Sequence, residues 1–318
     1  FDDDPDGLCS YLLLKKYTGR GKGIVVKSSP ELSHHYLKKV NEVKPDKIFI
    51  LDKPLVCDEF FEKAPVPVIW LDHHDIHNPK GVKYYNPKQF GKSFPISYFC
   101  YKITESNSWI SVVGSLSDWY KPRILNSFAK KYPHILPDPK KSIPEILFED
   151  TPFSKLCKIF RFALKGQESD IERSISNLEK IQSPDELLDN KTKESKAILA
   201  HFKEIDAQYQ VILKKALKTK PENGFLVFTY CSNQISITSN LSNELIYHFP
   251  DTILIVGREK EDKINMSIRS PNKPIPEALQ KALSGLNGSG GGHENACGAN
   301  MSKKDFPEFI KRLKENLK

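Results

Sequence analysis

Residues 66–74 read VPVIWLDHH, an apolar run that ends in an aspartate and two histidines. The same pattern occurs upstream, where the run KIFILD ends at Asp52. Short strands rich in Ile and Val that alternate with helical stretches such as ELSHHYLKKVNEV are typical of a parallel α/β sheet. Ligands of such sheets bind at the carboxyl ends of the strands. The sequence therefore predicts a functional site where Asp52 and residues 72–74 meet.

Further acidic residues fit this pattern. Asp118 follows the apolar run WISVVGSLS, which we expect to be a strand, and the opening FDDDPDG places Asp4 and Asp6 in a turn. A solvated acidic terminus is the alternative for the opening segment taken alone. Carboxylates and imidazoles gathered at one sheet edge are costly unless a cation neutralises them. Oxygen ligands with one or two imidazoles suit Mn²⁺ or Mg²⁺, and a pair of such ions supports hydrolysis of a phosphate ester.

The chain of 318 residues is long enough for two domains. We expect an α/β fold with an N-terminal parallel-sheet domain over residues 1–150. The segments 153–166, 169–181 and 193–218 have the pattern of amphipathic helices and predict a helical connector over residues 151–220. Strand-like runs return after that point and predict a smaller C-terminal α/β domain over residues 221–318. The runs of this last domain are GFLVFTY, QISITS, TILIVGRE and KINMSIRS. In the first domain, GIVVKS is a further strand-like run.

Composition narrows the class of protein. The formal charge of +8 comes from 48 basic and 40 acidic residues, and this modest excess agrees with a polyanionic partner. The six cysteines form no C-x-x-C pair, so we expect a cytoplasmic protein without a disulfide framework. No apolar run approaches the roughly 20 residues that a membrane span needs. The acidic opening has no signal-peptide pattern.

A second signature lies near the end of the chain, where residues 288–298 read GSGGGHENACG. A flexible linker is the alternative interpretation. Successive glycines allow backbone N–H groups to approach a phosphate closely, as in anion-binding nests. We therefore expect a glycine loop that binds a phosphorylated ligand.

Together these motifs resemble the DHH phosphoesterase family, with its DHH-associated C-terminal domain that carries a GGGH motif. The family includes RecJ-type exonucleases and nano-RNases. The resemblance implies two Mn²⁺ ions, with Mg²⁺ as a possible substitute, and it implies that Asp52 bridges them. Its other implied metal ligands are Asp4, Asp6, His73 and Asp118, with His73 on the ion that Asp6 also binds. His74 would contact the scissile phosphate, and the triplet Asp72-His73-His74 gives the family its name.

The resemblance also implies a binding site for the terminal nucleotide of the substrate in the C-terminal domain. Its residues would be Arg269, Gly290, Gly291, Gly292 and His293. One family ligand, often a histidine four residues before the position of Asp4, would precede Phe1. We therefore expect either a longer natural chain or substitution by Asp2.

The function that these motifs predict is a manganese-dependent phosphodiesterase. It would be a hydrolase, and more narrowly an exonuclease, that acts on single-stranded DNA or RNA or on short oligonucleotides from one end. One alternative is a small-nucleotide phosphatase or cyclic-dinucleotide phosphodiesterase. A non-enzymatic alternative is a replication scaffold related to RecJ, against which the retained ligand residues argue. The GGGH motif disfavours the related manganese pyrophosphatases as an interpretation of this sequence. The sequence does not decide the oligomeric state, and a homodimer is one possibility.

Overall fold

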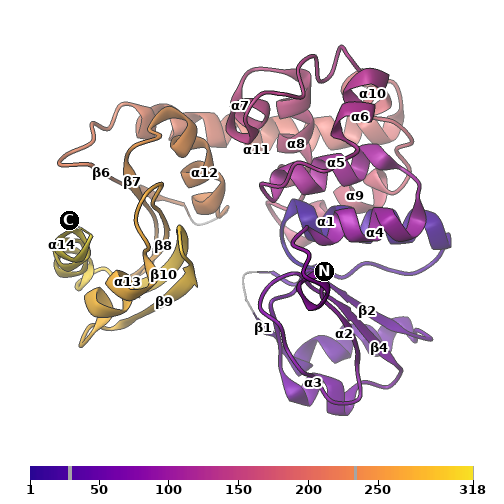
Figure 1. Cartoon of the computed structure of the whole chain (residues 1–318), viewed down its shortest axis with the longest axis horizontal. Helices are drawn as coiled ribbons and strands as arrows, with labels where there is room; N and C mark the ends of the chain where they lie inside the picture. The colour runs from indigo at the N-terminus through magenta and orange to yellow at the C-terminus, as the bar shows by residue number, and fades with distance from the viewer. Residues whose placement is uncertain (28–30, 233–234, 318) are drawn as a thin grey trace. The chain divides into compact units, whose positions relative to one another are not determined.

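The computed structural model describes residues 1–27, 31–232 and 235–317. The chain forms two compact units (Figure 1): Phe1–Leu164 with Glu168–Phe202, and Lys165–Gln167 with Lys203–Lys318. We call them unit 1 and unit 2. Each combines sheet and helices, which confirms the predicted α/β class. The greater part of the expected connector, residues 151–164 and 168–202, groups with unit 1. The boundaries at 150 and 220 stay predictions.

The sheet of unit 1 is parallel, as predicted. Strands β2 (Ile48–Leu51), β4 (Val68–Leu71) and β5 (Lys83–Tyr85) lie in that order, and Leu51 is in register with Leu71. On the other edge of β2, the backbone N–H of Asp2 donates to the carbonyl of Leu51 at 3.2 Å. A separate parallel pair joins β1 (Glu31–Leu32) to β3 (Leu55–Val56). The segments that follow β2 and β4 therefore begin at the same edge of the sheet.

Helices make up the rest of unit 1. Near the sheet, η1 (His34–Tyr36), α2 (Leu37–Val43) and α3 (Asp58–Lys63) contribute to a core that includes Trp70. A second group consists of α1 (Pro5–Thr18), α4 (Ile96–Thr104) and α5 (Ser108–Ser117), which pack against one another. The remaining elements are η2 (Pro87–Phe90), α6 (Leu125–Lys131), α7 (Ile143–Phe148), α8 (Pro152–Ala163), α9 (Glu168–Leu178), α10 (Pro184–Leu188) and α11 (Lys193–Leu217). The last of these continues into unit 2.

Three strand predictions were wrong. The run 109–117 lies in helix α5, in which Trp109 through Leu116 are all buried. A helix that is apolar all round gives the same continuous signal as a buried strand. Residues 23–27 form only an isolated bridge, Asp2 with Val26, and residue 28 lies outside the described residues. In QISITS, Gln234 is outside them too, Ile235 and Ile237 alternate as buried residues, and α12 begins at Thr238.

Unit 2 contains a five-stranded sheet in the order β6-β7-β8-β10-β9. The pair β6–β7 is parallel, and the other neighbours are antiparallel. On one face, α13 (Pro276–Leu283) and α14 (Phe306–Asn316) complete an apolar core. On the other, α12 (Thr238–His248) packs against β7 and β8. The strands are β6 (Phe225–Cys231), β7 (Ile253–Lys260), β8 (Lys263–Arg269), β9 (Gly288–His293) and β10 (Ala296–Ser302).

We expected the glycine run to be a loop, and this prediction was wrong. The run forms the edge strand β9 of this sheet. Its hairpin with β10 explains two of its glycines. A Cβ at Gly292 would lie 2.4 Å from the carbonyl oxygen of Ala296, and one at Gly290 would lie 2.8 Å from that of Gly298. Such contacts are too short for any side chain. Across the described parts of the chain, no helix has the length and apolar character needed to cross a membrane.

Candidate active site

The structure brings the predicted acidic and imidazole side chains of unit 1 together. Asp52 follows β2 directly, and Asp72, His73 and His74 follow β4. The backbone N–H of Asp52 still bonds to the carbonyl of Leu71 at 2.8 Å, so the two segments leave the sheet side by side. The other members come from helix ends: Asp4 and Asp6 from the start of α1, and Asp118 from the end of α5. Asp118 was expected at a strand end, and this part of the prediction was wrong.

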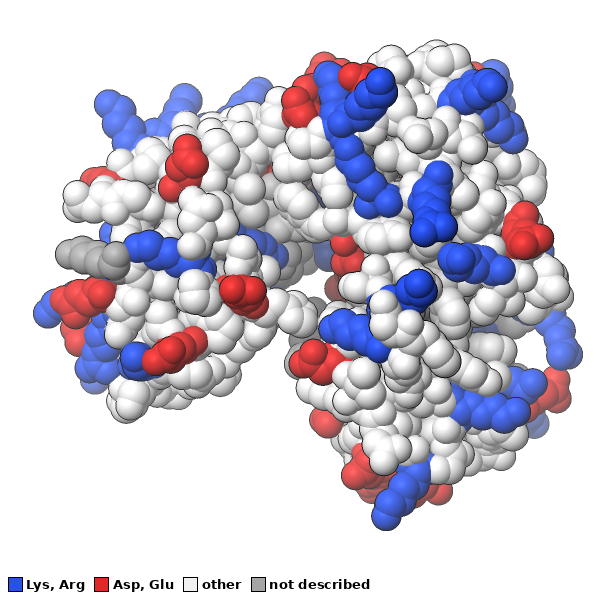
Figure 2. Space-filling model, viewed as in Figure 1, with Lys and Arg blue, Asp and Glu red and all other residues white. Residues whose placement is uncertain are grey.

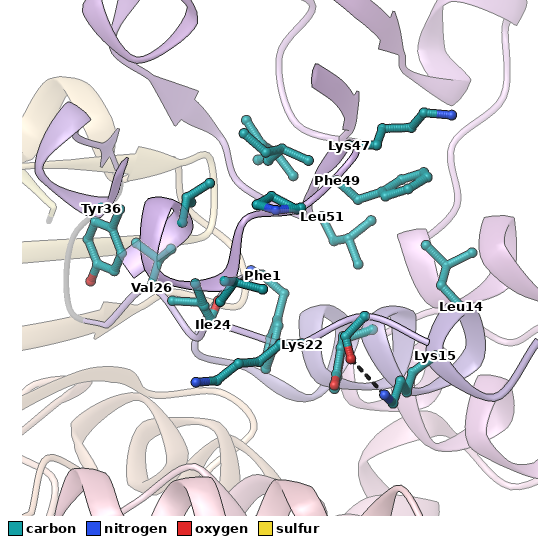
Figure 3. A pocket seen from close by; sticks show the side chains of 18 of the residues that line it. Phe1, Leu14, Lys15, Lys22, Ile24, Val26, Tyr36, Lys47, Phe49 and Leu51 are labelled. Carbon is teal, nitrogen blue, oxygen red and sulfur yellow. Dashed lines mark hydrogen bonds between the residues drawn. The ribbon is translucent and has the colours of Figure 1, made fainter. Parts of the chain in front are cut away.

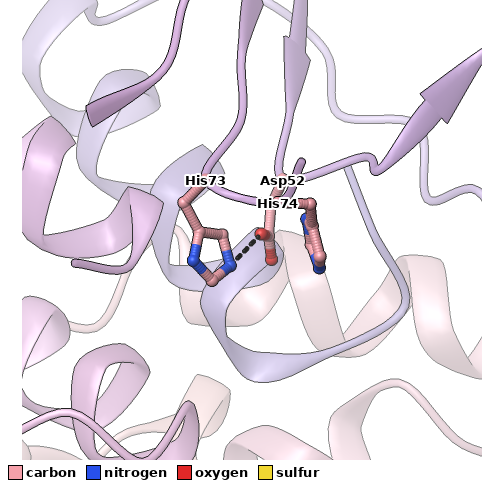
Figure 4. Close-up of side chains that lie close together, drawn as sticks. All are labelled: Asp52, His73 and His74. Atoms are coloured by element: carbon pink, nitrogen blue, oxygen red, sulfur yellow. Dashed lines mark ion pairs between the residues drawn. The ribbon is translucent and has the colours of Figure 1, made fainter. Parts of the chain in front are cut away.

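Asp52 is the most constrained residue of this group. Its side chain is 1% exposed, and its backbone has φ of 61°, in the left-handed region that non-glycine residues rarely adopt. Its Oδ1 atom is buried and accepts no hydrogen bond from any described residue. The Nε2 atom of His73 lies 3.2 Å from this oxygen (Figure 4). A buried carboxylate oxygen without a donor is costly, and strained backbone is often found at functional sites.

Asp118 adds a second carboxylate beside His73. Its Oδ2 atom lies 3.7 Å from His73 Nε2. It occupies the C-cap position of α5, where the negative end of the helix dipole disfavours another negative charge. A bound cation would relieve both the dipole interaction and the repulsion from the neighbouring carboxylates.

Asp6 is held by the start of another helix. Its carboxylate accepts hydrogen bonds from the backbone N–H groups of Ile96 at 2.7 Å and Ser97 at 2.9 Å, and from the Ser97 hydroxyl. Asp4 caps α1 and accepts a hydrogen bond from the backbone N–H of Gly7 at 2.9 Å. The sequence predicts such a cap, because Asp followed by Pro is favourable at a helix start. Both carboxylates are therefore fixed in direction.

His74 is oriented by the aspartate that begins its own triplet. Asp72 is fully buried, and its Oδ1 lies 2.7 Å from His74 Nδ1, while its Oδ2 accepts the backbone N–H of His74 at 3.0 Å. Asn86 donates to the carbonyl of His74 at 3.1 Å. These contacts from Asp72 and Asn86 fix the plane of the His74 imidazole and direct its Nε2 atom away from Asp72. Burial lowers the pKa of His74, but the hydrogen bond and charge of Asp72 outweigh it and raise the pKa above its usual value.

The carboxylates of the cluster have raised pKa values. Burial, followed by the charges of Asp2 and Asp6, raises the pKa of Asp4 to about 7. Burial raises the pKa of Asp52 well above its usual range, and the nearby Asp4 and Asp6 add to the effect. The pKa of Asp118 is raised for the same reasons. Such a cluster favours a bound cation, because a cation stabilises the ionised form that burial and mutual repulsion disfavour.

Two overlapping sets of side chains have the geometry of a metal site. One is Asp52, His73 and His74; the other is Asp6, His73 and Asp118. Within each set, the donor atoms lie within 4.8 Å of one another. His73 belongs to both sets, Asp52 to the first, and Asp4 to neither. His74 joins the first set, although we expected it to contact phosphate. Carboxylate and imidazole donors suit Mn²⁺ or Mg²⁺.

Sequence reasoning missed Lys53. Its side chain is 1% exposed, and its Nζ donates to Asp2 Oδ1 at 2.7 Å. The indole of Trp70 donates to its backbone carbonyl at 3.0 Å. A buried lysine beside a carboxylate cluster offsets part of the negative charge. The available signal was its position directly after the strand-ending Asp52, which gives no side-chain direction by itself.

In unit 2, Arg269 lies at the end of β8 and His293 at the end of β9, each opposite Ala296 of β10. Arg269 donates from Nε to Asn243 at 3.0 Å and from an η nitrogen to the carbonyl of Ile268 at 3.0 Å. Burial lowers its pKa to about 10, so the guanidinium stays charged at neutral pH. Strand register thus places both predicted substrate-binding side chains near one end of the β8–β10–β9 ladder.

A cavity of about 640 Å³ lies elsewhere in unit 1 (Figure 3). Its lining is largely apolar and includes Ile24, Val26 and Phe49, with Lys15 bonded to the carbonyl of Gly21 at 2.6 Å near its rim. Lys53 lines it as well and also bonds to Asp2 of the acidic cluster. None of the predicted metal ligands lines this cavity. It therefore supplies no part of the site described above.

Comparisons with known proteins concern the fold of this chain. Residues 224–318 match the DHHA1 domain family. No curated protein matches the sequence significantly. Among solved structures, the exonuclease RecJ bound to manganese aligns over 99% of this chain and 88% of its own, with 17% identity and a TM-score of 0.55.

Two further structures show the same fold. The DHH domain of a member of the s1p family of ribosomal proteins aligns over 99% of this chain and 84% of its own, with 14% identity and a TM-score of 0.65. A pGpG-specific phosphodiesterase from Vibrio cholerae aligns over 99% and 97%, with 11% identity and a TM-score of 0.51. At these identities the likeness concerns the fold. It confirms the predicted resemblance in architecture, from the first strand of unit 1 to the DHHA1 domain.

Proposed function

We propose that this chain, a DHH-family phosphoesterase by its fold and its DHHA1 domain, is a metal-dependent phosphodiesterase that hydrolyses short oligonucleotides from one end. The proposal rests mainly on the environment of Asp52. This residue is buried and has a left-handed backbone, and its Oδ1 atom faces His73 without a hydrogen bond. A divalent cation bound at this carboxylate would interact with the buried Oδ1 atom and could take part in catalysis.

The residues that would hold two divalent ions are those of the two geometric sets. His73 belongs to both sets, with Asp52 and His74 in one and Asp6 and Asp118 in the other. The family resemblance suggests that both ions would share Asp52. Asp4 interacts electrostatically with Asp6 of the same cluster, and the family resemblance suggests it as a further ligand. When bound, such ions neutralise phosphate charge and supply a hydroxide at neutral pH. Mn²⁺ is our first choice and Mg²⁺ the second, since a RecJ structure of this fold contains manganese.

The protein's own groups would position the phosphate. His74, whose Nδ1 is held by Asp72, would direct its other nitrogen to a phosphate oxygen. Asp72 is thus a positioning residue, which acts through His74. The main-chain bonds from Ile96 and Ser97 fix Asp6 and so keep its carboxylate from turning away.

Unit 2 would hold the end of the substrate. Arg269 supplies a fixed positive charge, and His293 and the glycine strand lie in register with it through β10. Basic and acidic side chains are interspersed on the face shown in Figure 2, without a broad basic region. A long nucleic acid would need many phosphate contacts. The face in this view has no continuous basic track for a long single strand, and we propose a short substrate.

One comparison favours a narrower alternative, a phosphodiesterase for dinucleotides. The structure of a pGpG-specific phosphodiesterase shares this fold over almost the whole chain. Both candidates use the same ligand residues and differ only in the length of the substrate. A replication scaffold is a third candidate, and it requires no metal-dependent turnover.

The test is digestion of end-labelled DNA and RNA, from dinucleotides to long single strands, with cyclic dinucleotides in parallel. We expect hydrolysis that needs Mn²⁺, disappears with a chelator and is faster on short oligonucleotides. Hydrolysis of dinucleotides alone would favour the narrower candidate. Turnover that survives complete chelation, or no turnover on any substrate, would contradict the proposal.

A further inference from the structure

One face of the unit 2 sheet is polar and exposed along β10 and β9. On β8 the same face borders helix α12, where the buried Ser267 hydroxyl lies 2.8 Å from that of Ser242. Side chains of one strand alternate between faces, so the apolar core residues Met266, Ile268 and Met301 point to the opposite side. The exposed row consists of Asn265, Asn300 and Ser289, which are aligned across the three strands. The next row along the same face is Ser267, Gly298 and Gly291, and the third is Arg269, Ala296 and His293.

The two glycines of the middle row are not required by the fold. A Cβ at Gly291 would meet no atom within 4 Å, and one at Gly298 would come no closer than 3.8 Å to the carbonyl oxygen of Met266. By contrast, Gly290 and Gly292 on the opposite face have no room for a side chain. Glycine at an open position of a strand often marks the place where a ligand approaches the backbone closely. Gly298 and Gly291 thus form a flat, exposed floor on β10 and β9 between the two polar rows.

Asn265 and Asn300 form a hydrogen-bonded pair across β8 and β10. The Asn300 side-chain nitrogen donates one hydrogen to Asn265 Oδ1. This bond uses one hydrogen of the Asn300 amide, and its second N–H hydrogen and its Oδ1 are left for a ligand. An amide in this state presents one donor and one acceptor in a plane. Asparagine recognises adenine through such a pair of bonds to N6 and N7.

The spacing of the rows fits a single nucleotide. Asn265 and Arg269 are four residues apart on one strand, which separates their rows by about 13 Å at the usual rise per residue. Arg269 carries the charge suited to a phosphate, whereas the asparagine row is neutral and suited to a base. A nucleotide with its phosphate at Arg269 would extend its sugar over the glycine floor and reach the asparagines with its base.

From this arrangement we infer that Asn300 is a specificity-determining residue that reads the base of the bound nucleotide and favours adenine, with Asn265 as its positioning residue. The inference rests on the proposed function, because it assigns the substrate of unit 2 to the nucleotides. It adds a base preference that a phosphate site alone would not give.

The experiment measures binding rather than turnover. Adenosine 5′-monophosphate, uridine 5′-monophosphate and ribose 5-phosphate are titrated into the full chain by calorimetry with a chelator present. For the wild type we expect adenosine monophosphate to bind roughly tenfold more tightly than uridine monophosphate, as a bidentate base contact gives. In Asn300→Ala the two affinities should become equal, while ribose 5-phosphate binds as before.

Two further variants separate recognition from folding. Asn300→Asp can still accept a hydrogen bond from Asn265 and so preserves the cross-strand pair, but it lacks the donor and should lose the adenine preference. Asn316→Ala, on α14 and bonded to the carbonyl of Arg312, is the matched control and should bind all three ligands normally. An adenine preference that survives in both Asn300 variants would overturn the inference. So would a parallel loss of ribose 5-phosphate binding, or a wild type without preference.

These outcomes are independent of the proposed reaction. A chain that prefers adenosine monophosphate but hydrolyses no phosphodiester would contradict the proposed function and support the base site. A chain that hydrolyses oligonucleotides but binds both nucleotides equally would do the reverse.

Discussion

In unit 1 the buried carboxylate of Asp52 and the half-buried carboxylate of Asp118 lie beside further carboxylates, and their pKa values are raised. In unit 2 the buried charge of Arg269 meets neutral acceptors, the Asn243 side chain and the carbonyl of Ile268. The first arrangement is unfavourable without a cation, and the second is satisfied within the protein. Negative charges that repel one another on a strained backbone point to chemistry, whereas satisfied polar groups of the second kind point to recognition.

The same contrast appears in the backbone. Asp52 adopts a left-handed conformation that a glycine would adopt more easily, yet the position has a carboxylate. In β9, glycine stands where side chains are excluded, at Gly290 and Gly292, and also at Gly291, where the space is open. Unit 1 therefore accepts strain to position a functional group. Unit 2 instead omits side chains beside its exposed polar rows.

The largest effect that we predict comes from Asp52→Asn. Loss of the shared carboxylate should lower kcat on oligonucleotides by roughly a thousandfold, about 4 kcal/mol, because metal ions contribute several kcal/mol of transition-state stabilisation. Steady-state kinetics with saturating Mn²⁺ measures this. Asp46→Asn, an exposed aspartate paired with Arg20, is the matched control and should keep full activity. Comparable kcat in Asp52→Asn would remove this residue from the site.

A smaller effect is expected from His293→Ala in unit 2. Loss of a charge-assisted hydrogen bond to phosphate should lower kcat/KM on oligonucleotides by roughly ten- to a hundredfold. Hydrolysis of bis-p-nitrophenyl phosphate, which has no nucleotide to bind, should change much less. Equal losses on both substrates, or weakened Mn²⁺ binding, would place His293 in the catalytic site. The assignment of chemistry to unit 1 and recognition to unit 2 would then be wrong.

The smallest effect concerns the stability of the metal-free chain. Because the pKa of Asp4 is raised to about 7 from 3.8, the folded state binds more protons than the unfolded state between these values. The free energy of unfolding should therefore fall as pH rises through this window, by at least about 1.4 kcal/mol, the equivalent of one pKa unit. The raised pKa of His74 acts in the same direction above pH 6.5.

Chemical denaturation at several pH values with a chelator measures this slope. Mn²⁺ should restore stability at pH 7.5 and have little effect near pH 5, where protons compete for the ligands. Asp52→Asn should flatten the slope, since it removes one of the repelling charges. A metal-free stability that rises between pH 4 and pH 7 would show that the carboxylates are not raised as described.

Much of this arrangement follows from sequence pattern, because the end of a strand is visible as an apolar run that stops at a polar residue. Asp52 and the triplet after β4 were placed in this way. Asp118 was placed at the end of the wrong element, since helix α5 is buried on every side and its apolar run has no helical periodicity to detect. Its nearness to His73 still followed, because the family motif includes it.

Tertiary direction is the part that sequence could not supply. Nothing in the run LDK shows that Lys53 turns inward to Asp2, or that the start of α4 holds Asp6. The glycine run likewise predicted a loop, although two of its glycines lie in a strand and are fixed by contacts across a hairpin. These features depend on segments that are distant in the chain and meet only in the folded protein.

The central claim is that Asp52 and its neighbours form a metal centre, and calorimetric titration of Mn²⁺ into the chelator-treated full chain at pH 7.5 tests it most directly. We predict that the wild type binds two ions and that Asp52→Asn loses at least one of them, while His293→Ala binds both. Equal Mn²⁺ binding by the wild type and Asp52→Asn, or no binding by either, would contradict the account.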